Sequence, residues 1–217
     1  SGTAQLPMTI ILCIRSWLAG HRNAIFLLLS LGWVGSVAAE AGIDHRPNIL
    51  LILADDLGYS DIGSYGSEIS TPNLDQLANN GLRFSSFYTT ASCAPTRAML
   101  LTGVDSHRAG VANISEALTP EQAHSPFYRC TLNHNVITIA TLLKDAGYDT
   151  AMSGKWHLGY LPEYNPVHQG FDEFTGYVSG NVDYHAHLDQ TGREDWWKQD
   201  ELHPESGYTT DLITDHR

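Results

Sequence analysis

Three short polar clusters hold the side chains that could carry chemistry in this chain. They are the pair Asp55 and Asp56, the stretch 93–97, and the pair Lys155 and His157. Adjacent carboxylates repel each other unless a cation lies between them, and a divalent ion suits that position. A lysine beside a histidine can hold charged oxygens and move a proton near neutral pH. The clusters therefore point to a metal ion and an anionic ester.

Each cluster alone also has a simpler explanation. An aspartate pair is common in a solvated turn, because turn positions accept aspartate readily. Cys93 precedes an expected helix that carries Arg97, and both features favour negative charge there, but a disulfide between Cys93 and Cys130 is the plainer alternative. A surface lysine and a hydrogen-bonded histidine would account for Lys155 and His157. The residue types alone leave these alternatives open.

The elements that must position the clusters alternate between strand and helix. Residues 49–54 are a short, continuous apolar run, which is typical of a strand buried on both faces of a sheet. Pro72 and Gly81 bound one expected helix, and Pro95 and Gly103 bound another, because proline favours the first helical position and glycine ends helices. All three clusters fall where a strand or a loop meets the next element.

The rest of the chain continues this alternation. Residues 82–90 alternate weakly and predict a strand, residues 138–147 predict a helix with Leu142 and Leu143 inward, and residues 148–159 predict a strand that runs into a loop. The order predicts an α/β fold with a mixed, largely parallel central sheet and helices on both faces. Ligands bind beyond the carboxyl ends of the strands in such sheets.

The charge balance limits the partners. The chain has 24 acidic and 12 basic residues, which gives a formal net charge of −12. A surface this acidic repels phosphate, so we expect neither nucleic acid nor an anionic membrane as a partner. It attracts cations instead, and carboxylate oxygens are the ligands that Ca²⁺ and Mg²⁺ prefer.

We expect residues 1–39 to be a few upstream residues followed by a secretory signal peptide from Met8. Arg15 and Arg22 form a basic lead, residues 24–37 are an apolar run too short to span a membrane comfortably, and small residues precede a cleavage site near residue 39. The signal predicts export to the periplasm or the extracellular space, or to the lysosome or the medium in a eukaryote. An uncleaved membrane anchor is the alternative.

The order and form of the clusters resemble the sulfatase family of the alkaline phosphatase superfamily. SCAPTRAMLLTG, residues 92–103, resembles the family's modification signature, which is Cys-x-Pro-x-Arg followed by an apolar pair and a glycine. GYDTAMSGKWH, residues 147–157, is similar to its second signature, and residues 46–66 resemble its opening strand and metal-binding pair. The resemblance is closest to arylsulfatases. It implies that residues 40–217, which end within an expected helix, are the N-terminal part of a sulfatase catalytic domain.

This resemblance implies a particular fate for Cys93. The family's signature cysteine is oxidised by a formylglycine-generating enzyme to formylglycine, an aldehyde whose hydrate attacks the sulfur of a sulfate ester and later expels sulfate. Arg97 and Lys155 would then stabilise negative charge, and His157 would assist deprotonation in the release step. By the same resemblance, Asp55, Asp56 and the modified Cys93 would bind Ca²⁺, with Mg²⁺ as the weaker candidate.

The implied metal site is unfinished within this sequence. Ca²⁺ takes about six to eight oxygen ligands, which two aspartates and one hydroxyl do not supply. The resemblance places further ligands beyond residue 217, and we expect residues 40–217 alone to be inactive and to bind metal weakly.

Three other functions remain possible on the sequence alone. They are a phosphate or phosphonate ester hydrolase of the same superfamily, an inactive binding homologue, and a cysteine hydrolase that uses the Cys93 thiolate. The Cys-x-Pro-x-Arg form favours a sulfatase. The natural substrate, a small-molecule or carbohydrate sulfate ester, is not readable because specificity resides in pocket loops.

Overall fold

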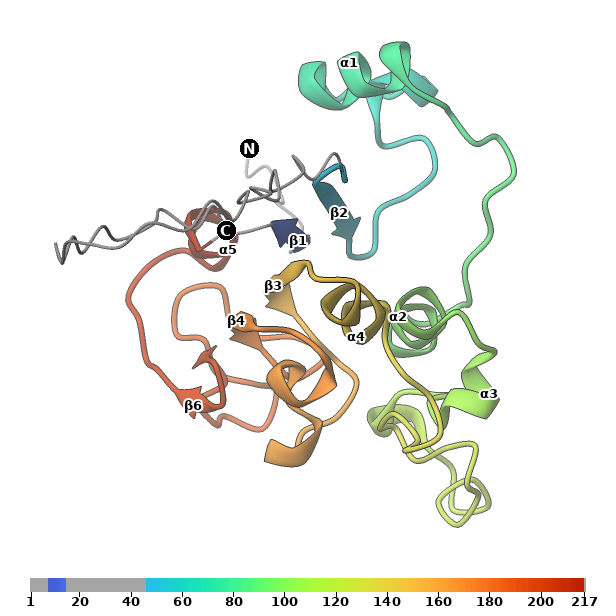
Figure 1. Cartoon of the computed structure of the whole chain (residues 1–217), viewed down its shortest axis with the longest axis vertical. Helices are drawn as coiled ribbons and strands as arrows, with labels where there is room; N and C mark the ends of the chain where they lie inside the picture. The colour runs from blue at the N-terminus through green and yellow to red at the C-terminus, as the bar shows by residue number, and fades with distance from the viewer. Residues whose placement is uncertain (1–7, 15–45, 217) are drawn as a thin grey trace, which may run out of the picture.

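The computed structural model describes residues 8–14 and 46–216. Within them the strands form a six-stranded sheet in the order β2-β1-β3-β4-β5-β6 (Figure 1). These strands are β1 Met8–Ile14, β2 Ile49–Ala54, β3 Asp149–Lys155, β4 Glu173–Tyr177, β5 Trp197–Lys198 and β6 Glu201–Leu202. β1 is antiparallel to both of its neighbours and β3 is parallel to β4, so β2, β3 and β4 run in one direction. The predicted α/β fold with a mixed sheet is confirmed, but the sheet is not largely parallel, because β3 with β4 is the one parallel pairing among the described strands.

Helices cover both faces of this sheet. The α-helices are α1 Pro72–Asn80, α2 Cys93–Thr102, α3 Ser106–Ala109, α4 Ile139–Asp145 and α5 Thr209–Asp215. Four 3₁₀ turns within the described residues are η1 Gly63–Tyr65, η2 Ser115–Ala117, η3 Pro162–Tyr164 and η4 Pro166–Gln169. α2 and α4 lie on one side of β3, and α5 lies on the other (Figure 1).

α2 carries Cys93 as its first residue and is fixed in place by its apolar side. Ala94, Ala98 and Leu101 are buried in the main hydrophobic cluster, together with Met152 of β3. Gly103 ends the helix with a left-handed φ of 69° and donates its N–H to the carbonyl of Met99, a conformation that glycine adopts without steric cost. The packing of α2 therefore fixes the position of Cys93 relative to the sheet.

Trp156 anchors the segment that follows β3. Its side chain is fully buried, and its ring packs edge-on against Phe171, with the two ring centroids 6.2 Å apart. Its Nε1 donates a hydrogen bond to the carbonyl oxygen of Tyr164 at 2.8 Å. Because Lys155 and His157 flank Trp156, the same anchor holds both of them at the end of β3.

Three details differ from the sequence-based expectations. β2 is not buried on both faces, because it lies at the edge of the sheet, where Leu50 is 55% exposed. Residues 82–90 form a loop instead of a strand, since no described strand lies alongside to pair with them. In α4, Ala140 is buried and Leu143 is half-buried, whereas Leu142 is 54% exposed, so the prediction that Leu142 faces inward is wrong.

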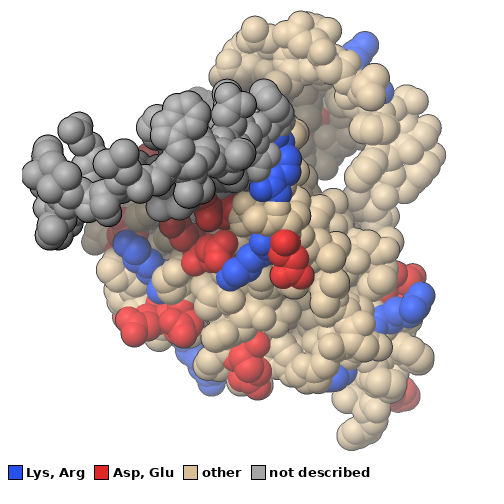
Figure 2. Space-filling model, viewed as in Figure 1, with Lys and Arg blue, Asp and Glu red and all other residues tan. Residues whose placement is uncertain are grey.

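The residues around α1 are largely exposed to solvent. None of the residues of α1 is buried, and apolar side chains such as Leu77 and Phe84 are exposed on and after this helix. In Figure 2 this region shows few charges, whereas acidic and basic side chains are interspersed over the rest of that face.

β1 lies within the segment predicted to be a signal peptide. The remainder of that segment, including Arg15, Arg22 and residues 24–37, falls outside the described residues, so the signal stays a prediction. Removal of residues 1–39 would take β1 out of the sheet and leave β2 and β3 without their shared neighbour. Among the described residues, no helix has both the length and the apolarity needed to cross a membrane.

Candidate active site

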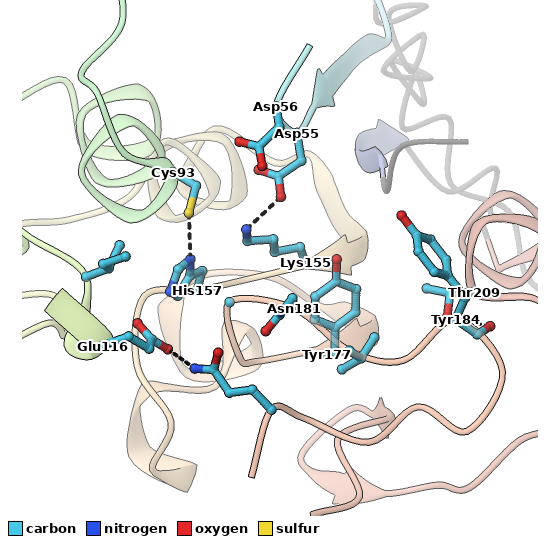
Figure 3. A pocket seen from close by; sticks show the side chains of 14 residues that line it. Asp55, Asp56, Cys93, Glu116, Lys155, His157, Tyr177, Asn181, Tyr184 and Thr209 are labelled. Atoms are coloured by element: carbon cyan, nitrogen blue, oxygen red, sulfur yellow. Dashed lines mark hydrogen bonds and ion pairs between the residues drawn. The ribbon is translucent and has the colours of Figure 1, made fainter. Parts of the chain in front are cut away.

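A cavity of about 420 Å³ opens at the carboxyl ends of three strands and brings the predicted clusters together (Figure 3). β2 ends directly before Asp55, β3 ends at Lys155, and β4 ends at Tyr177, and all three of these residues line the cavity. Asp56, Cys93 and His157 line it as well. The strand-edge position expected from the sequence is the one observed.

Asp55 lies at the centre of a buried charge network. Its Oδ2 accepts a hydrogen bond from Lys155 Nζ at 2.7 Å, and its Oδ1 lies 3.4 Å from Nη2 of Arg97. Arg97 also donates from Nη1 to the carbonyl oxygen of Lys155 at 2.6 Å. All three side chains are buried, so the two cations offset the cost of burying the carboxylate. Arg97 supports the cavity from behind and does not line it.

Cys93 is a free cysteine in contact with His157. Its Sγ lies 3.2 Å from Nδ1 of His157, and Cys130 is also a free, buried thiol, so the disulfide alternative does not hold. Burial and the nearby Lys155 lower the pKa of His157 to about 4, against a smaller opposing effect of Glu116. The imidazole is therefore neutral at pH 7 and can accept a proton at Nδ1.

Asp56 presents a second carboxylate to the same cavity. It has a left-handed φ of 54°, which turns the chain sharply after Asp55 and leaves Asp56 exposed. Figure 3 shows both aspartates on one side of the cavity with Cys93 nearby. The two carboxylates fit a hard cation in donor type. They do not complete a shell, since the described residues contain no group of three or more metal-ligating side chains close enough to hold an ion.

Sequence reasoning missed the remaining walls of the cavity. Tyr177, Asn181 and Tyr184 come from the end of β4 and the loop after it, whereas Glu116 and Gln190 come from η2 and a distant loop. The first group lies at the same edge as Lys155, because β4 runs parallel to β3 and ends beside it. Nothing in the local sequence marks Glu116.

The comparison with known proteins agrees with this geometry. The sequence model of the family described as Sulfatase matches residues 47–215. The chain belongs to the sulfatase family. It is 48% identical over 145 residues to human arylsulfatase A, 40% identical over 148 residues to an arylsulfatase of Klebsiella aerogenes, and 43% identical over 145 residues to an uncharacterized sulfatase of Schizosaccharomyces pombe.

These matches cover most of this sulfatase chain but only part of each relative. They include 65%, 67% and 65% of this chain, and 27%, 31% and 26% of the human, Klebsiella and Schizosaccharomyces proteins respectively. The chain therefore spans about a quarter to a third of the length of these relatives. Among solved structures, Ps i-CgsB matches with a TM-score of 0.61 and 31% identity over 72% of this chain and 37% of its own. Its complex with k-i-k-neocarrahexaose matches with a TM-score of 0.60 and the same identity and coverage.

Proposed function

We propose that the protein hydrolyses sulfate esters with a formylglycine made from Cys93 and a divalent cation. The observation that carries this proposal is the meeting of Cys93, His157, Lys155 and the aspartate pair in one cavity. These are the residues of the family's two signatures and its metal-binding pair, and they come from segments about 40 to 100 residues apart. The proposal extends to export of the protein through the signal predicted for residues 8–39.

The charge of the cavity supports a requirement for a cation. Asp55, Asp56 and Glu116 line it as acids, whereas Lys155 is the only lysine or arginine among the described lining residues. A sulfate monoester is itself an anion, so this lining would repel it. A divalent ion held by Asp55, Asp56 and the modified Cys93 would reverse that balance and would polarise a sulfate oxygen. We propose Ca²⁺ in preference to Mg²⁺, because Ca²⁺ accepts oxygen ligands in variable geometry, whereas Mg²⁺ demands near-ideal octahedral coordination.

The protein side chains have distinct roles in this proposal. Lys155 holds a charged sulfate oxygen with Nζ, and Asp55 fixes the direction of that ammonium group. His157 is neutral at pH 7 and takes a proton at Nδ1 from a hydroxyl on residue 93. Arg97 keeps the end of β3 in place through the Lys155 carbonyl and adds positive charge beneath the site. The formylglycine hydrate, once formed, supplies the nucleophilic hydroxyl.

The substrate class is open between two groups. Two of the relatives are named arylsulfatases, and one solved neighbour carries a neocarrahexaose, which is a carbohydrate. Aryl sulfates and sulfated sugars are therefore the two classes to test first, alongside phosphate esters as the alternative chemistry of the superfamily.

Mass measurement of the peptide that contains residue 93 tests the proposal. The full-length gene product is expressed in a host with a formylglycine-generating enzyme, and the peptide is expected to carry an aldehyde in place of the thiol. A matured, active protein that keeps the sulfur at residue 93 would contradict it. Cys130 is the matched control, because it is buried outside the signature and is expected to remain a thiol.

The rates of hydrolysis of a sulfate ester and of the matching phosphate ester distinguish sulfatase activity from phosphatase activity. For 4-nitrophenyl sulfate and 4-nitrophenyl phosphate under identical conditions, kcat/KM is expected to be higher for the sulfate. The reverse order would favour the phosphate ester alternative. In the same preparation, the mass of the N-terminal peptide shows whether export removes residues 1–39.

A further inference from the structure

One wall of the cavity is built around the carboxylate of Glu116. Its Oε1 accepts hydrogen bonds from Gln190 Nε2 at 2.5 Å and from the hydroxyl of Tyr160 at 3.0 Å, and Ser115 Oγ lies 3.2 Å from the same hydroxyl. Figure 3 shows Glu116 beyond His157, on the side away from Asp55 and Asp56. Glu116 and Gln190 are 74 residues apart, yet they line the cavity together.

A carboxylate at this position is unfavourable for the sulfate half of a substrate. Burial raises the pKa of Glu116, but hydrogen bonds from its backbone, Ser115 and Tyr160 outweigh burial and hold that pKa below its ordinary value. Glu116 is therefore ionised at pH 7 and repels any sulfate oxygen that approaches it. Its charge favours a group that donates hydrogen bonds, and in a sulfate ester that group lies on the alcohol half.

The Glu116 and Gln190 pair still has room to bind such donors. A carboxylate accepts about four hydrogen bonds. Gln190 and Tyr160 both donate to Oε1 of Glu116, so the hydrogen bonds of these two residues leave Oε2 unoccupied. Gln190 donates through Nε2 to Glu116, which leaves its amide oxygen as a second acceptor at the same wall.

The rest of the lining fits a hydroxylated ring better than a flat apolar one. Tyr177 and Tyr184 contribute aromatic side chains, Asn181 and Thr209 contribute polar ones, and Ile114 and Val182 are the aliphatic members of the described lining. A cavity of about 420 Å³ holds more than a sulfate group. Aromatic faces with a few directed acceptors suit a sugar ring, which has C–H faces and hydroxyl edges.

We propose that Glu116 and Gln190 bind hydroxyl groups of a sugar leaving group, so that they select sulfated carbohydrates over aryl sulfates. This inference rests on the proposed sulfate ester hydrolysis and names the residues that determine its specificity.

The test compares two substrates in the full-length, matured protein. The substrates are 4-nitrophenyl sulfate and the hexose monosulfate that the wild-type protein cleaves fastest. In Glu116→Gln, the sugar-to-aryl ratio of kcat/KM is expected to fall by about 10- to 100-fold, because the neutral amide is a weaker acceptor and misplaces Gln190. Gln190→Ala is expected to lower the ratio by a smaller factor. Glu121→Gln is the matched control, since Glu121 is exposed outside the cavity, and it leaves the ratio unchanged.

An unchanged ratio in Glu116→Gln overturns the inference, whether both rates fall together or neither falls. Parallel loss would mean that Glu116 acts through His157 or only ties two loops together. Cleavage of 4-nitrophenyl sulfate without cleavage of any hexose monosulfate overturns the inference and leaves the proposed function standing. If no ester is cleaved, calorimetric titration of Cys93→Ala with the hexose monosulfates still decides it, since their binding must weaken at least about tenfold when Glu116→Gln is added.

Discussion

The Sγ atom of Cys93 lies 3.2 Å from Nδ1 of His157, although 64 residues separate them in the chain. Cys93 begins α2 and His157 follows β3, so this contact exists only because α2 packs on the sheet. His157 adopts a left-handed φ of 61°, and its Nε2 is buried without a hydrogen-bond partner among the described residues. Backbone strain and a desolvated polar atom at one residue are typical of a functional site.

Replacement of His157 is expected to impair catalysis much more than folding. His157→Ala removes the proton acceptor at residue 93, so kcat should fall by about 100- to 10,000-fold in the full-length protein. His168→Ala is the control, because His168 is half exposed and lies outside the cavity; its kcat should stay within about twofold. Steady-state kinetics on 4-nitrophenyl sulfate measures both. Turnover of His157→Ala near the wild-type rate would exclude His157 from the reaction.

Two lysines with similar ion pairs are expected to differ in their effect on stability. Lys155 and Asp55 are buried, so Lys155→Met leaves a poorly compensated charge and should lower the free energy of unfolding by about 3 kcal/mol. Lys144 pairs with Asp172 at 2.6 Å but is half exposed, so Lys144→Met should cost less than about 1 kcal/mol. Urea unfolding of both variants of the full-length protein gives the comparison. Equal losses would show that the buried network contributes no more than a surface pair.

Removal of the cation is expected to abolish activity reversibly. A chelator specific for Ca²⁺ should stop hydrolysis of 4-nitrophenyl sulfate, and added Ca²⁺ should restore it more fully than Mg²⁺. Asp56→Asn should raise the Ca²⁺ concentration needed for half-maximal rate by at least about tenfold, since it removes one of the charged ligands. Asp61→Asn, outside the cavity, is the control. Full activity after chelation, with metal absent by elemental analysis, would refute the cation requirement.

Asp172 is expected to give the protein a pH-dependent contribution to stability. Burial raises its pKa, but hydrogen bonds from Lys144 and Thr150 outweigh burial and lower it below the ordinary 3.8. Because the pKa is lower in the folded state, the contribution is present above 3.8 and is lost as pH falls through the folded-state pKa.

The Asp172→Asn variant measures this contribution. At pH 7 it should be less stable than wild type by about 1–2 kcal/mol, and the difference should shrink as the pH drops below 3.8. Asp145→Asn, which replaces an exposed aspartate on the neighbouring α4, is the matched control variant. Urea unfolding midpoints of the wild type and both variants are measured across the pH range. A stability difference between wild type and Asp172→Asn that stays constant in acid would contradict the lowered pKa of Asp172.

Gly180 is expected to be required because it lies directly against the imidazole of His157. A Cβ at Gly180 would fall 2.9 Å from Cε1 and Nε2 of that ring, closer than real Cβ contacts. Gly180→Ala should displace the ring from Cys93 and lower kcat by at least about tenfold, with a smaller effect on KM. Gly81→Ala, at the end of α1 and outside the cavity, is the control for kcat. An unaffected kcat in Gly180→Ala would show that the ring position is not critical.

Local sequence was sufficient to predict the elements that carry the signatures. The apolar run of β2, the proline and glycine that bound α1, and the glycine that ends α2 each act within a few residues, so they can be read without the fold. The resemblance of residues 92–103 and 147–157 to the sulfatase signatures likewise depended only on residue order. It pointed to the family that the sequence comparison then showed.

The tertiary structure decided everything that depends on long-range packing. The edge position of β2, the exposed Leu142 and the absence of a strand at 82–90 follow from which elements lie alongside, and a local pattern does not contain that information. The 3.2 Å contact of Cys93 with His157 and the pairing of Glu116 with Gln190 join residues 64 and 74 positions apart. Sequence by itself determined which residues could do chemistry; only the packing of α2 and the loops on the sheet determined which of them meet.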